Sequence, residues 1–334
     1  MSTHRPGSSV TLKEHALAAT SIARELSREQ RKVNVTLGAS AMVGVLASVL
    51  KEHTRLSAVP SSLHAEAQFL GDHLVFDDLS IELLVAKESR KPVNLDKLKT
   101  DLTEHYRCTG DYHQENGRDA IVVRDEGAAA KLHNISLATA PRWVQRGDAL
   151  DSPHIYALPP PVVLLYLLYE TAEAVKSADQ ASTRRAFTLL YVFSILVHLR
   201  KNEGGLPAIT SIDWRAATWD HVIAQNALQD DAHKSRYSRV LDLLREGPTG
   251  TRAGLPHAVL HDWATRLSMQ TGYRSRTSSE RILVRLQTFL EKVTDMLLPN
   301  GASPAAHSLG KSLPAGMAVF HPDSARRRAF EGRF

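Results

Sequence analysis

The stretch "LVFDDLSIELLVA", residues 74 to 86, decides how the first half of this chain is interpreted. A short apolar segment leads into Asp77 and Asp78, and then Ser80 and Glu82 alternate with apolar residues. Alternation with a period of two predicts a β-strand whose successive side chains point to opposite faces of a sheet. Asp78, Ser80 and Glu82 are therefore expected on one face, where they either bind a metal ion or border a turn.

The segments around this stretch predict a small α/β domain with a mixed sheet over residues 33–150. Residues 1–32, with apolar residues at helical spacing between 11 and 32, are set apart as an N-terminal helix. Strands are expected at 74–76, 80–85, 120–123 and 132–137, and helices at 40–53 and 94–106.

Residues 151–299 change to helical periodicity and predict a larger, all-helical domain, which makes the fold class α+β. Prolines and glycines separate the expected helices. These helices are 162–177, 182–200, 214–228, 233–246, 255–270 and 277–298. Residues 300–334 are rich in Pro, Gly, Ser and Ala and end in a basic segment, so we expect a flexible basic tail.

Composition narrows the class of protein. The 334 residues are 43% hydrophobic and 23% charged, as in ordinary globular proteins. A single cysteine, Cys108, excludes an intramolecular disulfide and a zinc site built from cysteines. The charged N-terminus and the short apolar runs predict a soluble, cytoplasmic protein without a membrane partner. A formal charge of +5 is compatible with nucleic acid as a partner.

The order of elements between residues 33 and 140 resembles the nucleotidyltransferase superfamily, which has the polymerase-β-like fold, including relatives from abortive-infection and toxin–antitoxin systems. In that family a Gly-Ser turn opens a helix, an Asp-x-Asp lies on the next strand, and a later strand supplies a third acid. The acids hold divalent cations while the nucleotide phosphates are clamped. The resemblance therefore implies a nucleotide or RNA partner and Mg²⁺ as cofactor.

Matched to that pattern, Gly38 and Ser40 correspond to the nucleotide-binding turn, and Asp78 corresponds to the first acid. Ser80 stands where the second acid belongs, and Glu82 continues the same face. The expected catalytic and metal-binding residues are thus Asp78 and Glu82.

The third acid would lie near His133 or Asn134, and neither is acidic. The resemblance thus predicts a degenerate site, and any enzymatic activity would be metal-dependent nucleotidyl transfer. A simpler interpretation also stays open, in which Asp77 and Asp78 form a hairpin turn, because aspartate accepts turn geometry.

Histidines and arginines provide two further features. His257 and His261 are four residues apart on an expected helix and share its face, but no glutamate follows the first histidine, so the metalloprotease motif is absent. An ordinary polar helix face is the simpler interpretation.

Arginine guanidinium groups bind phosphates with two hydrogen bonds. The arginines expected to contact nucleic acid are Arg274, Arg276, Arg281, Arg285, Arg326, Arg327 and Arg328.

Three functional hypotheses follow. The first is a degenerate nucleotidyltransferase-like protein that binds nucleotide or RNA. The second is a nucleic-acid-packaging or coat-like protein that uses basic helices and the tail. The third is a helical protein-interaction module without chemistry. The first hypothesis predicts that Asp78 and Glu82 point into a cleft facing Ser40, the second predicts a continuous basic groove and self-association, and the third predicts neither.

Overall fold

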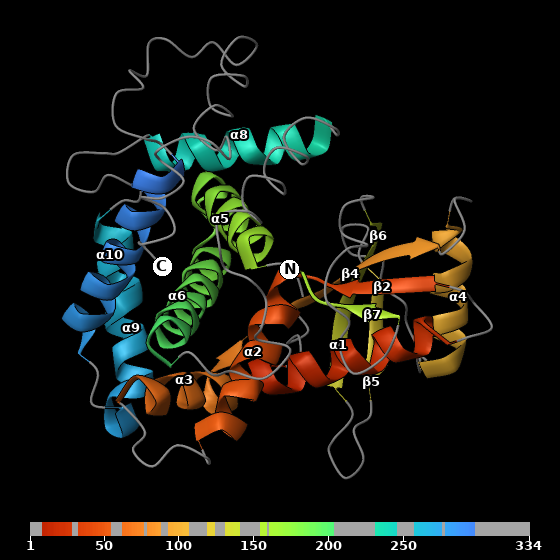
Figure 1. Cartoon of the computed structure of the whole chain (residues 1–334), viewed down its shortest axis with the longest axis horizontal. Helices are drawn as coiled ribbons and strands as arrows, with labels where there is room; N and C mark the ends of the chain where they lie inside the picture. The colour runs from red at the N-terminus through yellow and green to blue at the C-terminus, as the bar shows by residue number, and fades with distance from the viewer. Residues whose placement is uncertain are drawn as a thin grey trace, which may run out of the picture. The chain divides into compact units, whose positions relative to one another are not determined.

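A computed structural model shows how the chain folds, and it describes the following residues: 9–28, 33–54, 62–76, 79–87, 93–106, 119–123, 131–140, 154–158, 160–203, 231–245, 257–275 and 278–297. The chain divides into two compact units (Figure 1). Unit 1 comprises residues 1–60, 67–159 and 207–210, and unit 2 comprises 61–66, 160–206 and 211–334. A mixed sheet in unit 1 and helices in the described part of unit 2 confirm the α+β class.

Unit 1 is built on a five-stranded sheet with the order β5-β6-β4-β2-β7. β4 is antiparallel to β2 and parallel to β6, so the sheet is mixed as predicted. The strands are β2 (Val33–Leu37), β4 (Ser80–Lys87), β5 (Asp119–Val123), β6 (Lys131–Thr139) and β7 (Ile155–Tyr156). Two further strands, β1 (Val10–Thr11) and β3 (Val75–Phe76), form a separate antiparallel pair. The strands expected at 74–76, 80–85, 120–123 and 132–137 are all confirmed.

The helices of unit 1 are α1 (Leu12–Leu26), α2 (Ala39–Thr54), the second half of α3 (Ser62–His73), and α4 (Leu95–Tyr106). A capping box fixes the start of α1: the Thr11 hydroxyl accepts from the Glu14 amide at 3.2 Å, and Glu14 accepts from the Thr11 amide at 2.8 Å. α1 packs against α2, β2 and β4. The segment that the sequence set apart as an N-terminal helix is therefore packed into unit 1.

The pairing register gives the sheet of unit 1 two different faces. One face is apolar and carries Val35, Leu37, Leu83 and Val85, which lie opposite one another across β2 and β4 and are all 0% exposed. Side chains alternate along each strand, so the other face carries the buried Thr36, Leu84 and Ala86 together with half-buried polar residues. These polar-face residues are Asn34, Ser80, Glu82, Asn134, Ser136 and Tyr156.

Unit 2 packs helices around an aromatic core. Its helices are α5 (Pro160–Ser177), α6 (Gln180–Glu203), α8 (Asp231–Arg245), α9 (His257–Ser275) and α10 (Ser279–Leu297), together with the first part of α3. The Trp263 ring meets Phe187 and Tyr191 edge-to-face, each with centroids 5.7 Å apart, and its indole nitrogen donates to the Thr188 hydroxyl at 3.0 Å. Five of the six predicted helices are confirmed, while 214–228 and the predicted tail at 300–334 lie outside the described residues.

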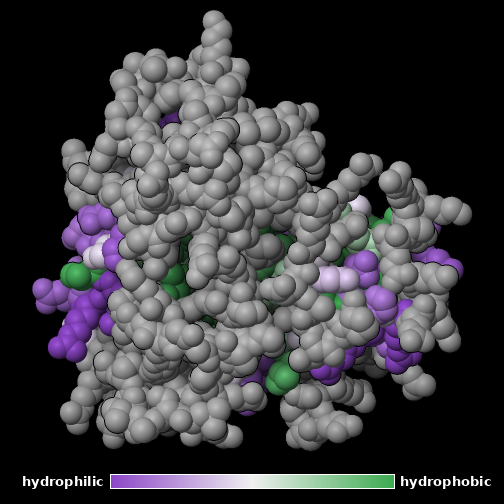
Figure 2. Space-filling view, viewed as in Figure 1, coloured by the Kyte–Doolittle hydropathy of each residue, from purple (hydrophilic) through white to green (hydrophobic). Residues whose placement is uncertain are grey.

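Hydrophilic residues gather at two places on the face of the molecule that Figure 2 shows. Figure 2 shows hydrophilic residues gathered over the positions that α9 and α10 occupy in Figure 1, and again over α1 and α4. None of the helices within the described ranges is both long enough and apolar enough to cross a membrane.

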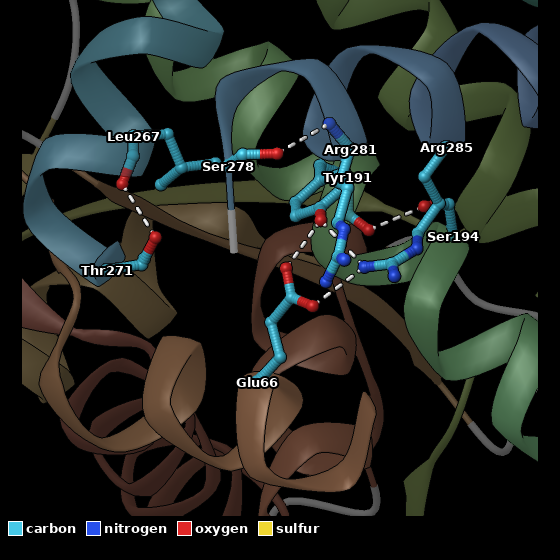
Figure 3. A network of polar contacts seen from close by, with 8 residues as sticks. All are labelled: Glu66, Tyr191, Ser194, Leu267, Thr271, Ser278, Arg281 and Arg285. Carbon is cyan, nitrogen blue, oxygen red and sulfur yellow. Dashed lines mark hydrogen bonds and ion pairs between the residues drawn. The ribbon is translucent and has the colours of Figure 1, made fainter. Parts of the chain in front are cut away.

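A buried ion pair ties α3, α6 and α10 together within unit 2 (Figure 3). Tyr191 Oη donates to Glu66 Oε1 at 2.5 Å, and Arg285 Nη1 donates to Glu66 Oε2 at 2.7 Å and to Tyr191 Oη at 2.9 Å. The Glu66 side chain is 4% exposed. Burial, reinforced by the Glu66 charge, raises the pKa of Tyr191, so its phenol stays protonated as a donor.

Replacing Arg285 by methionine should destabilise unit 2, because the Glu66 carboxylate would stay buried without its cation. We expect a loss of about 3–5 kcal/mol in the free energy of unfolding. The double variant Glu66→Gln/Arg285→Met should recover most of that loss. Urea unfolding checks this, with Arg266→Met as control, since Arg266 forms an exposed pair with Asp262 that is worth less than about 1 kcal/mol. Equal losses for Arg285→Met and Arg266→Met would contradict the role assigned to the buried pair.

Candidate functional site

The turn that opens α2 is docked directly on the backbone of β4. The Gly38 amide donates to the Glu82 carbonyl at 2.8 Å, and the Ser40 hydroxyl donates to the Ser80 carbonyl at 3.3 Å. A Cβ atom on Gly38 would lie 2.6 Å from the Glu82 carbonyl oxygen, so only glycine fits this close approach. The structure thus brings the predicted Gly-Ser turn together with the predicted acidic strand.

His15 of α1 completes the contacts of Ser40. Its Nε2 lies 3.0 Å from the Ser40 Oγ, and the two residues are 0% and 6% exposed. Because the Ser40 hydroxyl donates to Ser80, it accepts from His15, which therefore carries its proton on Nε2. We expected Ser40 to bind a nucleotide, but its hydroxyl is occupied inside unit 1.

Burial determines the charge state of His15. Burial, with a smaller contribution from His133 of β6, which is itself 3% exposed, lowers the pKa of the imidazole to about 3. His133 lies two residues before Ile135 on β6, so both side chains belong to the apolar face of the sheet. The Nδ1 of His15 is buried and has no hydrogen-bond partner in the described part of the chain.

Sequence reasoning missed His15, although a signal for it is present. His15 lies in the stripe formed by Leu12, Ala19, Ile22 and Leu26, all of which are 0% exposed. A polar residue within such a stripe is expected to be buried and to need a partner.

On the polar face, β4 and β6 bring together the positions that the sequence resemblance matched to the acids of the nucleotidyltransferase superfamily. Ser80 lies directly opposite Asn134, and Glu82 lies opposite Ser136. The Ser80 hydroxyl donates to the Asn134 carbonyl at 3.4 Å. The two segments are therefore neighbours, as the resemblance implies, but they carry hydroxyl and amide groups in place of two carboxylates.

The polar face as described does not fit two divalent cations. Glu82 is the single carboxylate that the register places on this face of the five described strands. Within the described ranges, no group of three or more His, Cys, Asp or Glu could hold a metal ion. A hard cation takes six or more oxygen ligands. Asp78, the other expected metal ligand, lies outside the described residues.

The predicted arginine patch is described in part. Arg281 is exposed near the start of α10, where its amide donates to the Ser278 hydroxyl at 3.4 Å (Figure 3). Arg285 Nη1 is engaged with Glu66 and Tyr191. The remaining side chains lie outside the described part, namely those of Arg274, Arg276, Arg326, Arg327 and Arg328. Contact of these arginines with nucleic acid stays a prediction.

Comparisons with known proteins add little. No protein-family model matches the chain, and no curated protein matches it. One solved structure, an antigenic nucleotidyltransferase-like protein from Paracoccidioides brasiliensis, is 12% identical, with 61% of this chain and 95% of that chain covered and a TM-score of 0.34. A likeness at that score carries no argument about this chain.

Unit 1 should lose stability in acid because of His15. In the unfolded chain the imidazole takes up a proton near the ordinary histidine pKa of 6.5, whereas in the folded chain burial lowers that pKa to about 3. Between these values the unfolded state binds more protons, so the free energy of unfolding falls by about 1.4 kcal/mol per pH unit as pH decreases.

Denaturant unfolding at a series of pH values between 7 and 4 checks this. His15→Gln should remove that part of the slope, while Ser40→Ala, which keeps the buried imidazole, should retain it. Identical slopes for His15→Gln and the unchanged protein would show that His15 does not titrate as described.

Proposed function

We propose that unit 1 is a nucleotidyltransferase-like domain that binds a nucleotide or an RNA end on the polar face of its sheet, and that it has lost most catalytic power. One observation carries this proposal: the Gly38–Ser40 turn is docked on β4, and β4 lies beside β6 with Ser80 opposite Asn134. That juxtaposition of turn, acidic strand and later strand is what the sequence resemblance requires.

The residues on this face favour binding over transfer. Hydroxyl and amide groups can exchange hydrogen bonds with the ribose and base of a nucleotide. Ser80 and Asn134 cannot neutralise the charge of a cation as carboxylates do, so the reacting phosphate would lack electrostatic stabilisation. In this proposal Glu82, with Asp78, would hold at most one Mg²⁺, which would offset part of the negative charge of a bound nucleotide.

Restoring the missing acid tests the proposal. Titration calorimetry of a nucleoside triphosphate with Mg²⁺ should show tighter binding to Ser80→Asp than to the unchanged protein, because a second carboxylate would join Glu82 on one face. Glu82→Gln should weaken the Mg²⁺-dependent part of the binding. Ser235→Asp is the matched control, since Ser235 is exposed on α8 and adds the same charge away from the sheet.

Two results together would remove the proposal. They are the absence of nucleotide binding by both the unchanged protein and Ser80→Asp, and an Asp78→Asn variant that alters only stability. Asp77 and Asp78 would then be a turn.

A further inference from the structure

We propose that His257 and His261 form a binding site for a divalent transition-metal ion on the first turns of α9. The site lies in unit 2 and is independent of the function proposed for the sheet of unit 1. The chemistry of two imidazoles selects copper, nickel or zinc and disfavours Mg²⁺ and Ca²⁺, which prefer oxygen ligands.

The geometry of the pair supports chelation. α9 begins at His257, and the two histidines four residues apart lie on one face of the helix. Their rings are stacked, with centroids 6.4 Å apart and planes inclined by 27°. Rotation about the side-chain bonds of either ring can turn one nitrogen from each toward a shared ion.

Both imidazoles are available. Each residue is exposed, and within the described residues the two rings contact each other and make no hydrogen bond. The neighbouring carboxylate, Asp262, is already engaged by Arg266 at 2.9 Å. A polar pair that faces solvent in this way can bind an ion without breaking a hydrogen bond to the described protein.

The part of α9 that carries the two histidines is packed against the core of unit 2. Between and just after the two histidines, Leu260, Trp263 and Ala264 are 0–2% exposed and fix this part of α9 in the core of unit 2. The helix therefore holds the second imidazole close once the first has bound, which raises its effective concentration. Two protein ligands leave the other coordination positions to water.

The helix dipole opposes the binding of any cation at this position. The N-terminal end of a helix carries a partial positive charge, which disfavours cations. Affinity must therefore come from the metal–nitrogen bonds, whose strength for divalent ions peaks at Cu²⁺. We expect Cu²⁺ to bind more tightly than Ni²⁺ or Zn²⁺, and Mg²⁺ not to compete.

The test is calorimetric titration of Cu²⁺ and Ni²⁺ into the full chain, with Mg²⁺ as the negative control. Because the chain has 16 histidines, matched variants locate the ion. His257→Ala and His261→Ala should each weaken the site on the order of a hundredfold, since each removes the chelate. The double variant Val259→His/His261→Ala keeps the number of histidines but places them two residues apart, on different faces, and should be equally weakened.

Circular dichroism shows whether each variant keeps its helix content, so that loss of binding can be distinguished from unfolding. Loss of a high-affinity event in all three variants, with helicity retained, supports the site. Absence of Cu²⁺ binding by the unchanged protein, or equal binding by the double variant, overturns it.

Discussion

The backbone of β4 is the constraint on which unit 1 depends. It is paired with β2 on one side and β6 on the other, and it also accepts hydrogen bonds from Gly38 and Ser40 at the start of α2. A shift of one residue in its register would exchange the apolar and polar faces of the strand, exposing Leu83 and burying Glu82. The docked turn opposes such a shift, because the Gly38 amide and the Ser40 hydroxyl would lose their acceptors, the carbonyls of Glu82 and Ser80.

Buried polar groups give each unit part of its specificity. In unit 1 the neutral His15 imidazole holds Ser40, and in unit 2 the Glu66 carboxylate is satisfied by Tyr191 and Arg285. Such groups are costly to bury unless their partners are present, so misfolded arrangements that separate them are disfavoured. The same hydrogen bond that fixes Ser40 also removes its hydroxyl from any ligand, which is why the polar face of the sheet carries the functional proposal.

Much of the fold follows from local periodicity, and less of the site does. The period-two pattern at residues 80–85 and 132–137 predicted strands that the structure makes neighbours, and five of the helices expected after residue 151 are present. No helix was predicted between residues 53 and 74, because Pro60 and the two serines after it are typical of a break, whereas α3 begins at Ser62.

Partners distant in the sequence explain the other differences. Nothing near Arg285 in the sequence indicates Glu66, which lies 219 residues away, and nothing near Ser40 indicates His15. A basic or hydroxyl side chain that is expected to bind a ligand can instead form its hydrogen bonds inside the protein. Which residue becomes its partner depends on the tertiary structure. The His257 and His261 pair is different, because both residues lie on one helix and the spacing alone predicts a shared face.

The most direct measurement of the central claim is the change in backbone amide resonances of the isotopically labelled chain when a nucleoside triphosphate is added. We predict changes in chemical shift at Ser80, Glu82, Asn134 and Ser136, on the polar face of the sheet. Ala19 and Ile22 in the buried stripe of α1 should show none. Changes confined to the helices of unit 2, or no change at a saturating nucleotide concentration, would contradict the assignment of nucleotide binding to this sheet.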